Sequence, residues 1–398
     1  MEKLEKLYAR LRATAVFRGV LTYPVFSLFE NYCKAEKGVE KKDAYAAFAA
    51  EIYRHGGNLT ELVKSLLFTD ENAYVKSVAK GEKPLKCIVD SARRELAVFS
   101  DFAALKSADF ASDMEESIKE IPLFDSVNAS LGALYEERLK NISKFGYGIF
   151  SGFGTFRFRE GKGIEPIISA DKIRLSHFIG YEEEREKIVE NTRAWLEGKP
   201  VLNALLCGDA GSGKSSTVKA VANEFFDEGV RLIEIRKDQL RSLPEVMEKI
   251  TDNPLKFIIF IDDLSFERSD DDFGVLKAIL EGSASVTAKN AVIYATSNRR
   301  HLVKERFSDR EGDDVHRNDT MQETVSLSER FGLVVRFSKP NKTLYLEIVK
   351  ALAKRYGVVM EEEELALRAE EFALRKGNRS ARSAEQFVNA IRAQSKEL

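Results

Sequence analysis

The feature that most constrains this chain is a glycine-rich segment between an apolar run at residues 204–207 and a helical pattern at 215–226. Its spacing matches G-x-x-x-x-G-K-[ST]. Glycines at such positions let successive backbone N–H groups point to one place, and the following helix adds a positive field, so the segment can cradle phosphate oxygens. A simple glycine turn is the alternative. The flanking pattern favours a phosphate site formed by Gly208, Asp209, Ala210, Gly211, Ser212, Gly213, Lys214, Ser215 and Ser216.

Two residues of this segment and two acids further on carry specific chemistry. Lys214 would place a cation at the β- and γ-phosphates of a nucleotide, and the Ser215 hydroxyl would ligate Mg²⁺. A later apolar run, residues 256–264, contains paired acids near its end. At the carboxyl end of a parallel strand, Asp262 can hold Mg²⁺ and Asp263 can polarise an attacking water. A solvated strand end is the structural alternative, but the position of the acids after the phosphate loop favours the functional interpretation.

Asn298 follows the next apolar run, residues 291–297. A neutral amide at this strand end can orient the same water or contact the γ-phosphate. Taken alone, the tripeptide Thr296-Ser297-Asn298 is equally typical of a polar turn.

The apolar runs predict an α/β core between helical segments. Near-continuous apolar runs separated by helical stretches indicate a parallel sheet covered on both faces. We expect five parallel strands, at 204–207, 231–236, 256–264, 291–297 and 333–337. Residues before about 140 and after Pro340 follow helical patterns only. The expected domains are a helical N-terminal domain at 1–143, a linker at 144–172, the α/β core at 173–338 and a helical lid at 339–398.

The expected linker begins with an unusual stretch, KFGYGIFSGFGTFRFRE at residues 144–160, in which aromatic residues alternate with glycines. One interpretation is a stacking platform for single-stranded nucleic acid. The other is a glycine-bent linker whose aromatic residues pack against a neighbouring domain. We favour the linker because no broader basic stripe accompanies the aromatic residues.

Composition limits the possible partners and compartments. The formal net charge of −2 over 398 residues gives no general attraction to nucleic acid or to anionic lipid. The three cysteines lack paired spacing and the four histidines are scattered, so we expect a reducing compartment and no zinc site. No uncharged apolar run approaches the roughly 18 residues of a membrane helix, and the N-terminus lacks a signal-peptide pattern. We therefore expect a cytoplasmic protein with no membrane partner.

The order of these segments resembles an AAA+ ATPase module over about residues 173–395, close to the initiator and helicase-loader side of that superfamily. More narrowly, the chain resembles the bacterial ATP-binding family catalogued as domain of unknown function 815. The stretches that carry this resemblance are GYEEEREKIVENTRAWLEGKP, GDAGSGKSSTVKA, IDDLSFE, ATSNRRHL, RFSDREGDD, SLSERFGL and RSARSAEQF.

The resemblance implies roles for individual residues. Arg330 is similar to an arginine finger that reaches the γ-phosphate of a neighbouring subunit, which implies self-association into a ring or a dimer. Arg382 is similar to the second sensor on the helical lid, with Arg379 as the alternative. Asn298 resembles the first sensor. The segment 179–181, with Ile179 and Tyr181, resembles the part that contacts adenine.

The chain also departs from the family pattern. Asp263 stands where many AAA+ enzymes have glutamate, and its shorter side chain leaves slow or gated hydrolysis open. No aromatic-hydrophobic-glycine pore loop follows the run at 231–236, although Phe273-Gly274 lies after the acids. The highly charged stretch 301–324 is an insertion, either a solvated loop or a loop that reports nucleotide state to a partner.

These observations predict an ATP- and Mg²⁺-dependent hydrolase that forms ADP and phosphate and remodels an unknown protein or nucleic-acid client. One alternative is a nucleotide-gated binding switch or loader with little turnover, for which DNA is a candidate partner. A small-molecule kinase is a second alternative, against which the stretch Ser328-Glu329-Arg330-Phe331-Gly332 and the helical lid argue.

Overall fold

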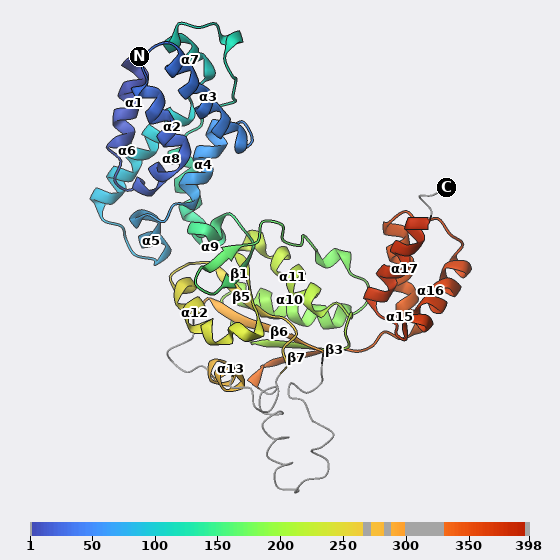
Figure 1. The fold of residues 1–398 in the computed structure, drawn as a ribbon. Coiled ribbons are helices and arrows are strands. Elements are labelled where there is room, and N and C mark those ends of the chain that lie inside the picture. Colours follow the sequence, from blue (N-terminus) through green and yellow to red (C-terminus); the bar gives the residue numbers. More distant parts are fainter. Residues whose placement is uncertain (1, 266–271, 282–287, 299–329, 395–398) are drawn as a thin grey trace. The chain divides into compact units, whose positions relative to one another are not determined.

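The computed structural model describes residues 2–265, 272–281, 288–298 and 330–394, and the chain divides into two compact units (Figure 1). Unit 1 consists of Met1–Phe153 together with Asp252–Leu255. Unit 2 consists of Gly154–Thr251 and Lys256–Leu398. The boundary between the units therefore falls inside the stretch 144–172 that we expected to be a linker.

Within its described residues, unit 1 is built from helices packed around an aromatic core. Leu4, Leu7 and Leu11 recur at helical spacing and are all buried. Edge-to-face and tilted ring pairs join Phe29, Phe48, Phe102 and Phe110 in the core. The helices are α1 (Glu2–Arg12), α2 (Pro24–Lys34), α3 (Val39–Arg54), α4 (Leu59–Thr69), α5 (Ala73–Ala79), α6 (Lys86–Ala103), α7 (Ser107–Met114), α8 (Leu131–Lys140) and α9 (Ile142–Phe145). The predicted all-α N-terminal region is confirmed.

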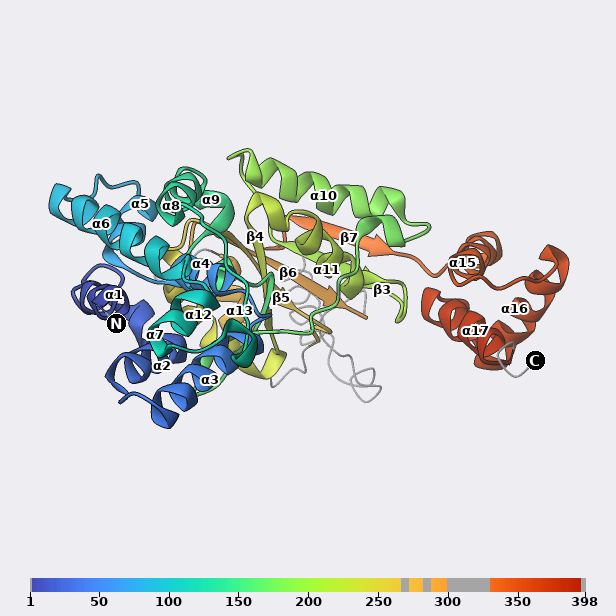
Figure 2. The same cartoon turned by 90° about the horizontal axis from the view of Figure 1, so that it is seen from above.

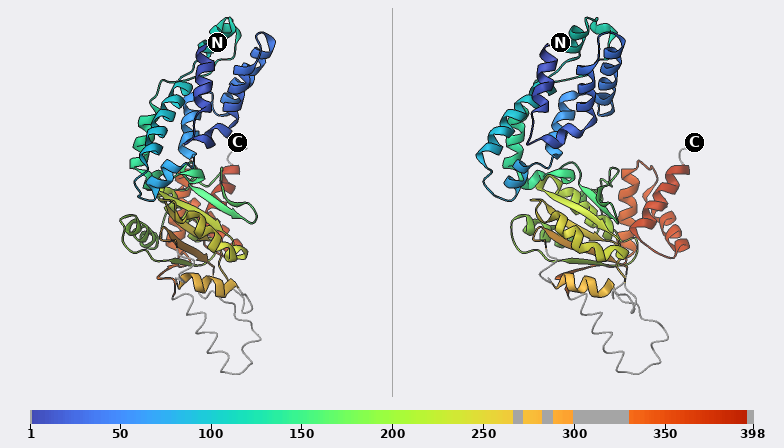
Figure 3. Two further views of the ribbon diagram at one scale, coloured as in Figure 1. Left: turned by 90° about the vertical axis from the view of Figure 1, so that its left-hand side faces the viewer. Right: turned by 60° about the vertical axis from the view of Figure 1, so that its left-hand side comes forward.

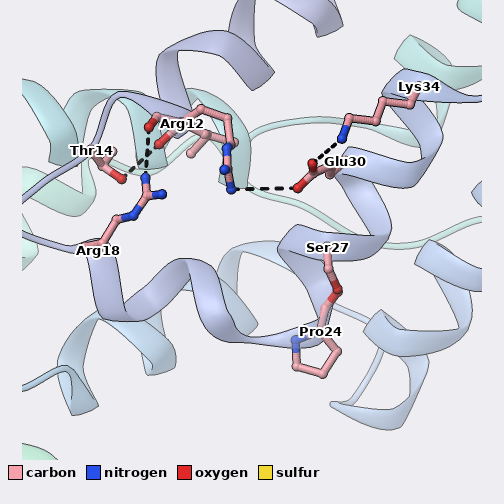
Figure 4. A network of polar contacts seen from close by, with 8 residues as sticks. Arg12, Thr14, Arg18, Pro24, Ser27, Glu30 and Lys34 are labelled. Carbon is pink, nitrogen blue, oxygen red and sulfur yellow. Dashed lines mark hydrogen bonds and ion pairs between the residues drawn. The ribbon is translucent and has the colours of Figure 1, made fainter.

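The connection between α1 and α2 is held by polar contacts to the backbone and between side chains. Figure 4 shows Arg18 donating to the Arg12 carbonyl oxygen and Arg12 of α1 paired with Glu30 of α2. On the buried side of the same connection lies Glu95 of α6, which is only 7% exposed. Its carboxylate accepts the backbone N–H groups of Ala15 at 2.9 Å, Val16 at 3.1 Å and Phe17 at 2.9 Å.

Replacing Glu95 with alanine leaves these three N–H groups without their acceptor. We expect a loss of about 3 kcal/mol or more in the free energy of unfolding, measured by urea denaturation. Glu95→Gln keeps a neutral acceptor and should lose less. Asp101→Ala on the same helix removes only an exposed ion pair with Arg10 and serves as the control, with about 1 kcal/mol or less expected. A Glu95→Ala protein as stable as the control would contradict this role.

Unit 2 contains one seven-stranded sheet in the described part of the chain, in the order β2-β1-β4-β5-β6-β3-β7. All neighbouring pairs are parallel except β1 and β2. The strands are β1 (Thr155–Arg159), β2 (Gly163–Pro166), β3 (Ala204–Gly208), β4 (Val230–Ile235), β5 (Lys256–Ile261), β6 (Ala291–Ser297) and β7 (Leu333–Phe337). The five predicted parallel strands are β3 to β7, and the prediction of five strands in total was too low.

The two additional strands come from the stretch that we expected to be a linker. Phe156 pairs with Ile233 of β4, so the hairpin of β1 and β2 extends the sheet at its edge. Phe156 and Phe158 are buried, whereas Arg157 and Arg159 are exposed and pair with Glu165. This period-two pattern belongs to a half-buried strand, and the surrounding glycines had concealed it. Two of the aromatic residues are thus committed to packing and are unavailable for stacking on bases.

Helices cover both faces of the sheet (Figure 2). Helices α10 (Glu182–Leu196) and α11 (Lys214–Glu224) pack on one face, where Ile188 and Val221 meet Leu206 and Ile258 in one apolar cluster. Helices α12 (Leu243–Thr251) and α13 (Asp272–Leu280) lie on the other side. This double cover explains the continuous apolar strands from which the sheet was predicted.

The lid consists of three helices with a core of their own (Figure 3). They are α15 (Lys342–Arg355), α16 (Glu362–Lys376) and α17 (Ala381–Gln394). Tyr345, Ala369 and Val388 are fully buried between them. Among the helices of the described residues, none has the length and apolar character required to cross a bilayer.

Candidate functional site

The glycine-rich segment connects β3 to α11, as its sequence context predicted. Gly208 has φ +145°, and a Cβ atom there would lie 2.0 Å from the Phe337 carbonyl oxygen of β7. Gly213 has φ +89° and directly precedes α11. Both positions therefore require glycine, one for close backbone approach and one for a left-handed turn. The loop ends at the N-terminus of a helix, where the dipole favours an anion.

Lys214 is the first residue of α11 and is only 5% exposed. Its Nζ donates to the carbonyl oxygens of Gly208 at 2.9 Å and Asp209 at 2.8 Å, and to Oδ1 of Asn298 at 3.0 Å. Burial lowers the pKa of Lys214, and nearby carboxylates, that of Asp209 first, oppose this effect in part. The ammonium group is therefore held inside the loop by neutral acceptors, which a phosphate oxygen can replace.

The two acids directly follow β5, and their side chains make different contacts. Oδ1 of Asp262 accepts the hydroxyls of Ser215 at 2.6 Å and Thr296 at 2.5 Å. Asp263 has φ +52°, which is rare for a residue with a side chain, and its Oδ1 accepts from Nδ2 of Asn298 at 2.7 Å. Because β6 lies between β5 and β3, the strand that precedes the acids is not the immediate neighbour of the phosphate-loop strand. Two polar residues at the end of β6 make the connection: Thr296 contacts Asp262, and Asn298 contacts both Lys214 and Asp263.

These oxygens fit a hard divalent cation. The Ser215 hydroxyl and the Asp262 carboxylate already lie at hydrogen-bond distance from each other. Hydroxyl and carboxylate oxygens are the ligand types that Mg²⁺ takes, together with water and substrate phosphates. Sequence reasoning missed Thr296, because a threonine before a turn carries no distinctive signal of its own.

A cavity of about 910 Å³ opens from the phosphate loop to the lid. Ile179 and Tyr181, which the resemblance relates to adenine contacts, both line it. The Tyr181 ring packs on Phe337, its hydroxyl donates to the Ser338 carbonyl oxygen at 2.6 Å, and burial raises the pKa of Tyr181 to about 12. Lining residues that the sequence did not indicate include Phe178, Arg355 and Tyr356.

The two arginines considered for the lid are placed differently. Arg382, in the first turn of α17, lines the cavity, and its backbone N–H donates to the Gly211 carbonyl oxygen at 3.4 Å. Arg379 forms a two-point ion pair with Glu370, at 3.0 and 2.8 Å, and faces a separate hollow of about 210 Å³. The geometry therefore favours Arg382 as the lid residue that faces a bound ligand.

Arg330 is not among the described residues that line the cavity. Its Nε donates to Oε1 of Glu281 at 2.7 Å, just after the end of α13. The resemblance expects Arg330 to act on a neighbouring copy, so its place outside this cavity is compatible with that role and does not test it. The charged stretch 301–324 lies outside the described residues.

A mostly parallel sheet with the phosphate loop after β3, paired acids after β5, a polar end on β6 and a helical lid is the fold of the AAA+ class of proteins. The sequence profile of the family described as "Protein of unknown function (DUF815)" matches residues 152–395, and the chain belongs to this family. The resemblance found in the sequence is therefore confirmed.

Other similarities are more distant. The replication factor C large subunit of Thermofilum pendens is 34% identical over 134 residues, which are 31% of this chain and 31% of that protein. The protein of the same name from Staphylothermus marinus is 30% identical over 74 residues, 18% of this chain and 17% of that protein. The chain thus spans less than a third of these curated relatives. The solved structure of the Thermotoga maritima RuvB Holliday junction branch migration motor is 16% identical, with a TM-score of 0.38 over 55% of this chain and 64% of that chain.

The tight contact at Gly208 leads to a prediction about stability. In Gly208→Ala, the new Cβ meets backbone rather than a movable side chain, so β3 or β7 must shift. We expect unit 2 to lose about 2 kcal/mol or more, measured by thermal unfolding. Gly198→Ala is the control, because that glycine also has positive φ but open space around its Cβ position, and about 1 kcal/mol is expected. Equal losses in the two variants would contradict the steric explanation.

Proposed function

We propose that this protein binds ATP with Mg²⁺, hydrolyses it to ADP and phosphate, and uses the cycle to remodel a macromolecular partner. The observation that carries the proposal is a pair of hydrogen-bond chains at the carboxyl ends of the strands. One runs from Lys214 through Asn298 to Asp263, and the other from Ser215 to Asp262. The residues to which this proposal assigns the phosphates, the metal and the water therefore line one cavity.

Each residue has a defined task in this proposal. The backbone N–H groups of 208–216 and Lys214 hold the phosphates, and Ser215 and Asp262 hold Mg²⁺, which would neutralise charge on the phosphate oxygens. Asp263 accepts the proton of a water whose oxygen attacks the γ-phosphorus. The bond from that phosphorus to the bridging oxygen breaks, ADP leaves with the bond electrons, and the proton passes to solvent. Asn298 orients the water.

The lid would turn nucleotide state into movement. Arg382 on the lid and the segment with Ile179 and Tyr181 border the same cavity, so a ligand there contacts lid and core together. Arg330 would complete the pocket of an adjoining copy in a ring or dimer. The partner is a protein or a nucleic acid, and the expected location is the cytoplasm, with no membrane partner.

One observation favours a second candidate, a nucleotide-gated switch with little turnover. Asp263 is one methylene shorter than glutamate, and its Oδ1 already accepts from Asn298. A carboxylate held in this way must leave the amide before it can reach a water.

Two substitutions separate binding from hydrolysis. Lys214→Ala should abolish uptake of ATP with Mg²⁺, because it removes the cation of the phosphate site. Asp263→Asn should keep that uptake and reduce phosphate release by about 100-fold or more, since the general base is lost. Binding is measured by isothermal titration and turnover by steady-state phosphate release. Wild-type protein that binds ATP without turnover would support the switch, and unchanged uptake in Lys214→Ala would refute the proposed site.

A mixing experiment tests whether Arg330 acts on a neighbouring copy. Lys214→Ala and Arg330→Ala proteins should each be inactive alone. If the arginine acts in trans, an equimolar mixture should regain phosphate release, because some interfaces then pair an intact phosphate site with an intact arginine. Glu281→Gln, which removes the charge paired with Arg330, serves as a variant that keeps the arginine. A mixture as inactive as its components would contradict action in trans.

A further inference from the structure

Thr296 lies between the phosphate loop that follows β3 and the acids that follow β5. It lies near the carboxyl end of β6, between the acid strand β5 and the phosphate-loop strand β3, and is in register with Leu206 of β3. Its side chain is buried, with only 1% of the residue exposed. A hydroxyl in such a place must use its donor and acceptor within the protein.

The Thr296 hydroxyl both donates a hydrogen bond to and accepts a hydrogen bond from the pair of acids. Oγ1 of Thr296 donates to Oδ1 of Asp262 at 2.5 Å and accepts the backbone N–H of Asp263 at 3.0 Å. The carbonyl oxygen of Thr296 accepts the N–H of Leu264 at 2.7 Å. One residue of β6 therefore contacts three consecutive residues of the segment that follows β5.

The contacts to Asp263 bear on its backbone. At φ +52° the residue is in the left-handed region, which costs about 1 kcal/mol or more without glycine. Hydrogen bonds to Thr296 lie on either side of this turn, at the N–H groups of 263 and 264. The turn directs the Asp263 side chain to Asn298 while that of Asp262 stays on Ser215.

The contact to Asp262 matters most when a cation is present. Oδ1 of Asp262 accepts from both Ser215 and Thr296. If the Ser215 oxygen were to ligate a cation, Thr296 would still donate to the same carboxylate from the interior of the protein. Thr296 would thus help to keep the carboxylate oriented toward that cation.

We propose that Thr296 is a positioning residue that holds Asp262 for the cation and Asp263 for the water. This inference rests on the proposed function, and it assigns the residue that makes the two acids act as a pair. If the hydroxyl only provided hydrogen bonds to the residues that follow β5, its loss would lower stability. It would not change the dependence of nucleotide affinity on Mg²⁺.

The test compares Thr296→Val with Thr296→Ser in the full chain. Valine keeps the shape and removes the hydroxyl, whereas serine retains it. ATP affinity is measured by isothermal titration with Mg²⁺ and with EDTA. We expect Thr296→Val to reduce the gain in affinity that Mg²⁺ provides by about 10-fold or more, with the EDTA value unchanged, and Thr296→Ser to restore it. Turnover with Mg²⁺ should fall in kcat as well as through a raised KM for ATP.

The matched control is Thr192→Val. Thr192 is also fully buried, and its hydroxyl contacts the Ile188 carbonyl oxygen and the Tyr294 hydroxyl, away from the site. It should lower thermal stability while leaving the effect of Mg²⁺ unchanged. If Thr296→Val does not fold, Thr296→Ala replaces it for the same comparison.

Each outcome decides the inference. An unchanged Mg²⁺ effect in the folded Thr296 variant, or an equal change in Thr192→Val, overturns the role of Thr296 and leaves the proposed function standing. Wild-type protein that fails to bind ATP with Mg²⁺ overturns both. A selective loss that serine restores supports the positioning role.

Discussion

The insertion of β6 between the phosphate-loop strand and the acid strand is the constraint on which the site depends. Parallel strands present their carboxyl ends at one edge, so β3, β6 and β5 deliver their following residues to one place. Lys214 and the acids are separated by the width of a strand, and the polar end of β6 fills that space. Thr296 reaches the acids, and Asn298 reaches both Lys214 and Asp263.

Much of this arrangement could be predicted from the sequence because its determinants are local. The glycines of 208–213 are needed for conformations that other residues resist, and the buried strands β3, β5 and β6 are near-continuous apolar runs. The helical lid and the N-terminal helices follow apolar spacing. Lys214 and Ser215 were identified from the glycine-rich motif, and Asp262 and Asn298 from their positions at strand ends. The structure brings these four side chains together.

The remaining features depend on partners distant in sequence. The strand of Phe156 and Phe158 is recognisable only from its pairing with β4, since the glycines around it also suit a linker. No single segment of the sequence indicates the order of the strands. Without that order, nothing predicts that Thr296 contacts the acids. The pairing of Arg330 with Glu281 likewise joins residues that no local pattern relates. These features therefore depend on contacts between distant segments, which the hydrophobic periodicity of a single segment does not reveal.

The contacts of Asn298 connect the charge of Lys214 with the freedom of the Asp263 carboxylate to turn toward a water. Its Oδ1 accepts from Lys214, and its Nδ2 donates to Asp263, so one amide serves both. Burial lowers the pKa of Lys214, which means that its charged form is less favourable here than in water. A phosphate that draws the ammonium group away would relieve this cost and remove one of the two bonds that fix the amide. The other bond, to Asp263, would then lose part of its geometric support, and the carboxylate could turn to a water. Ligand binding at the loop and release of the acid would thereby be linked through a single side chain.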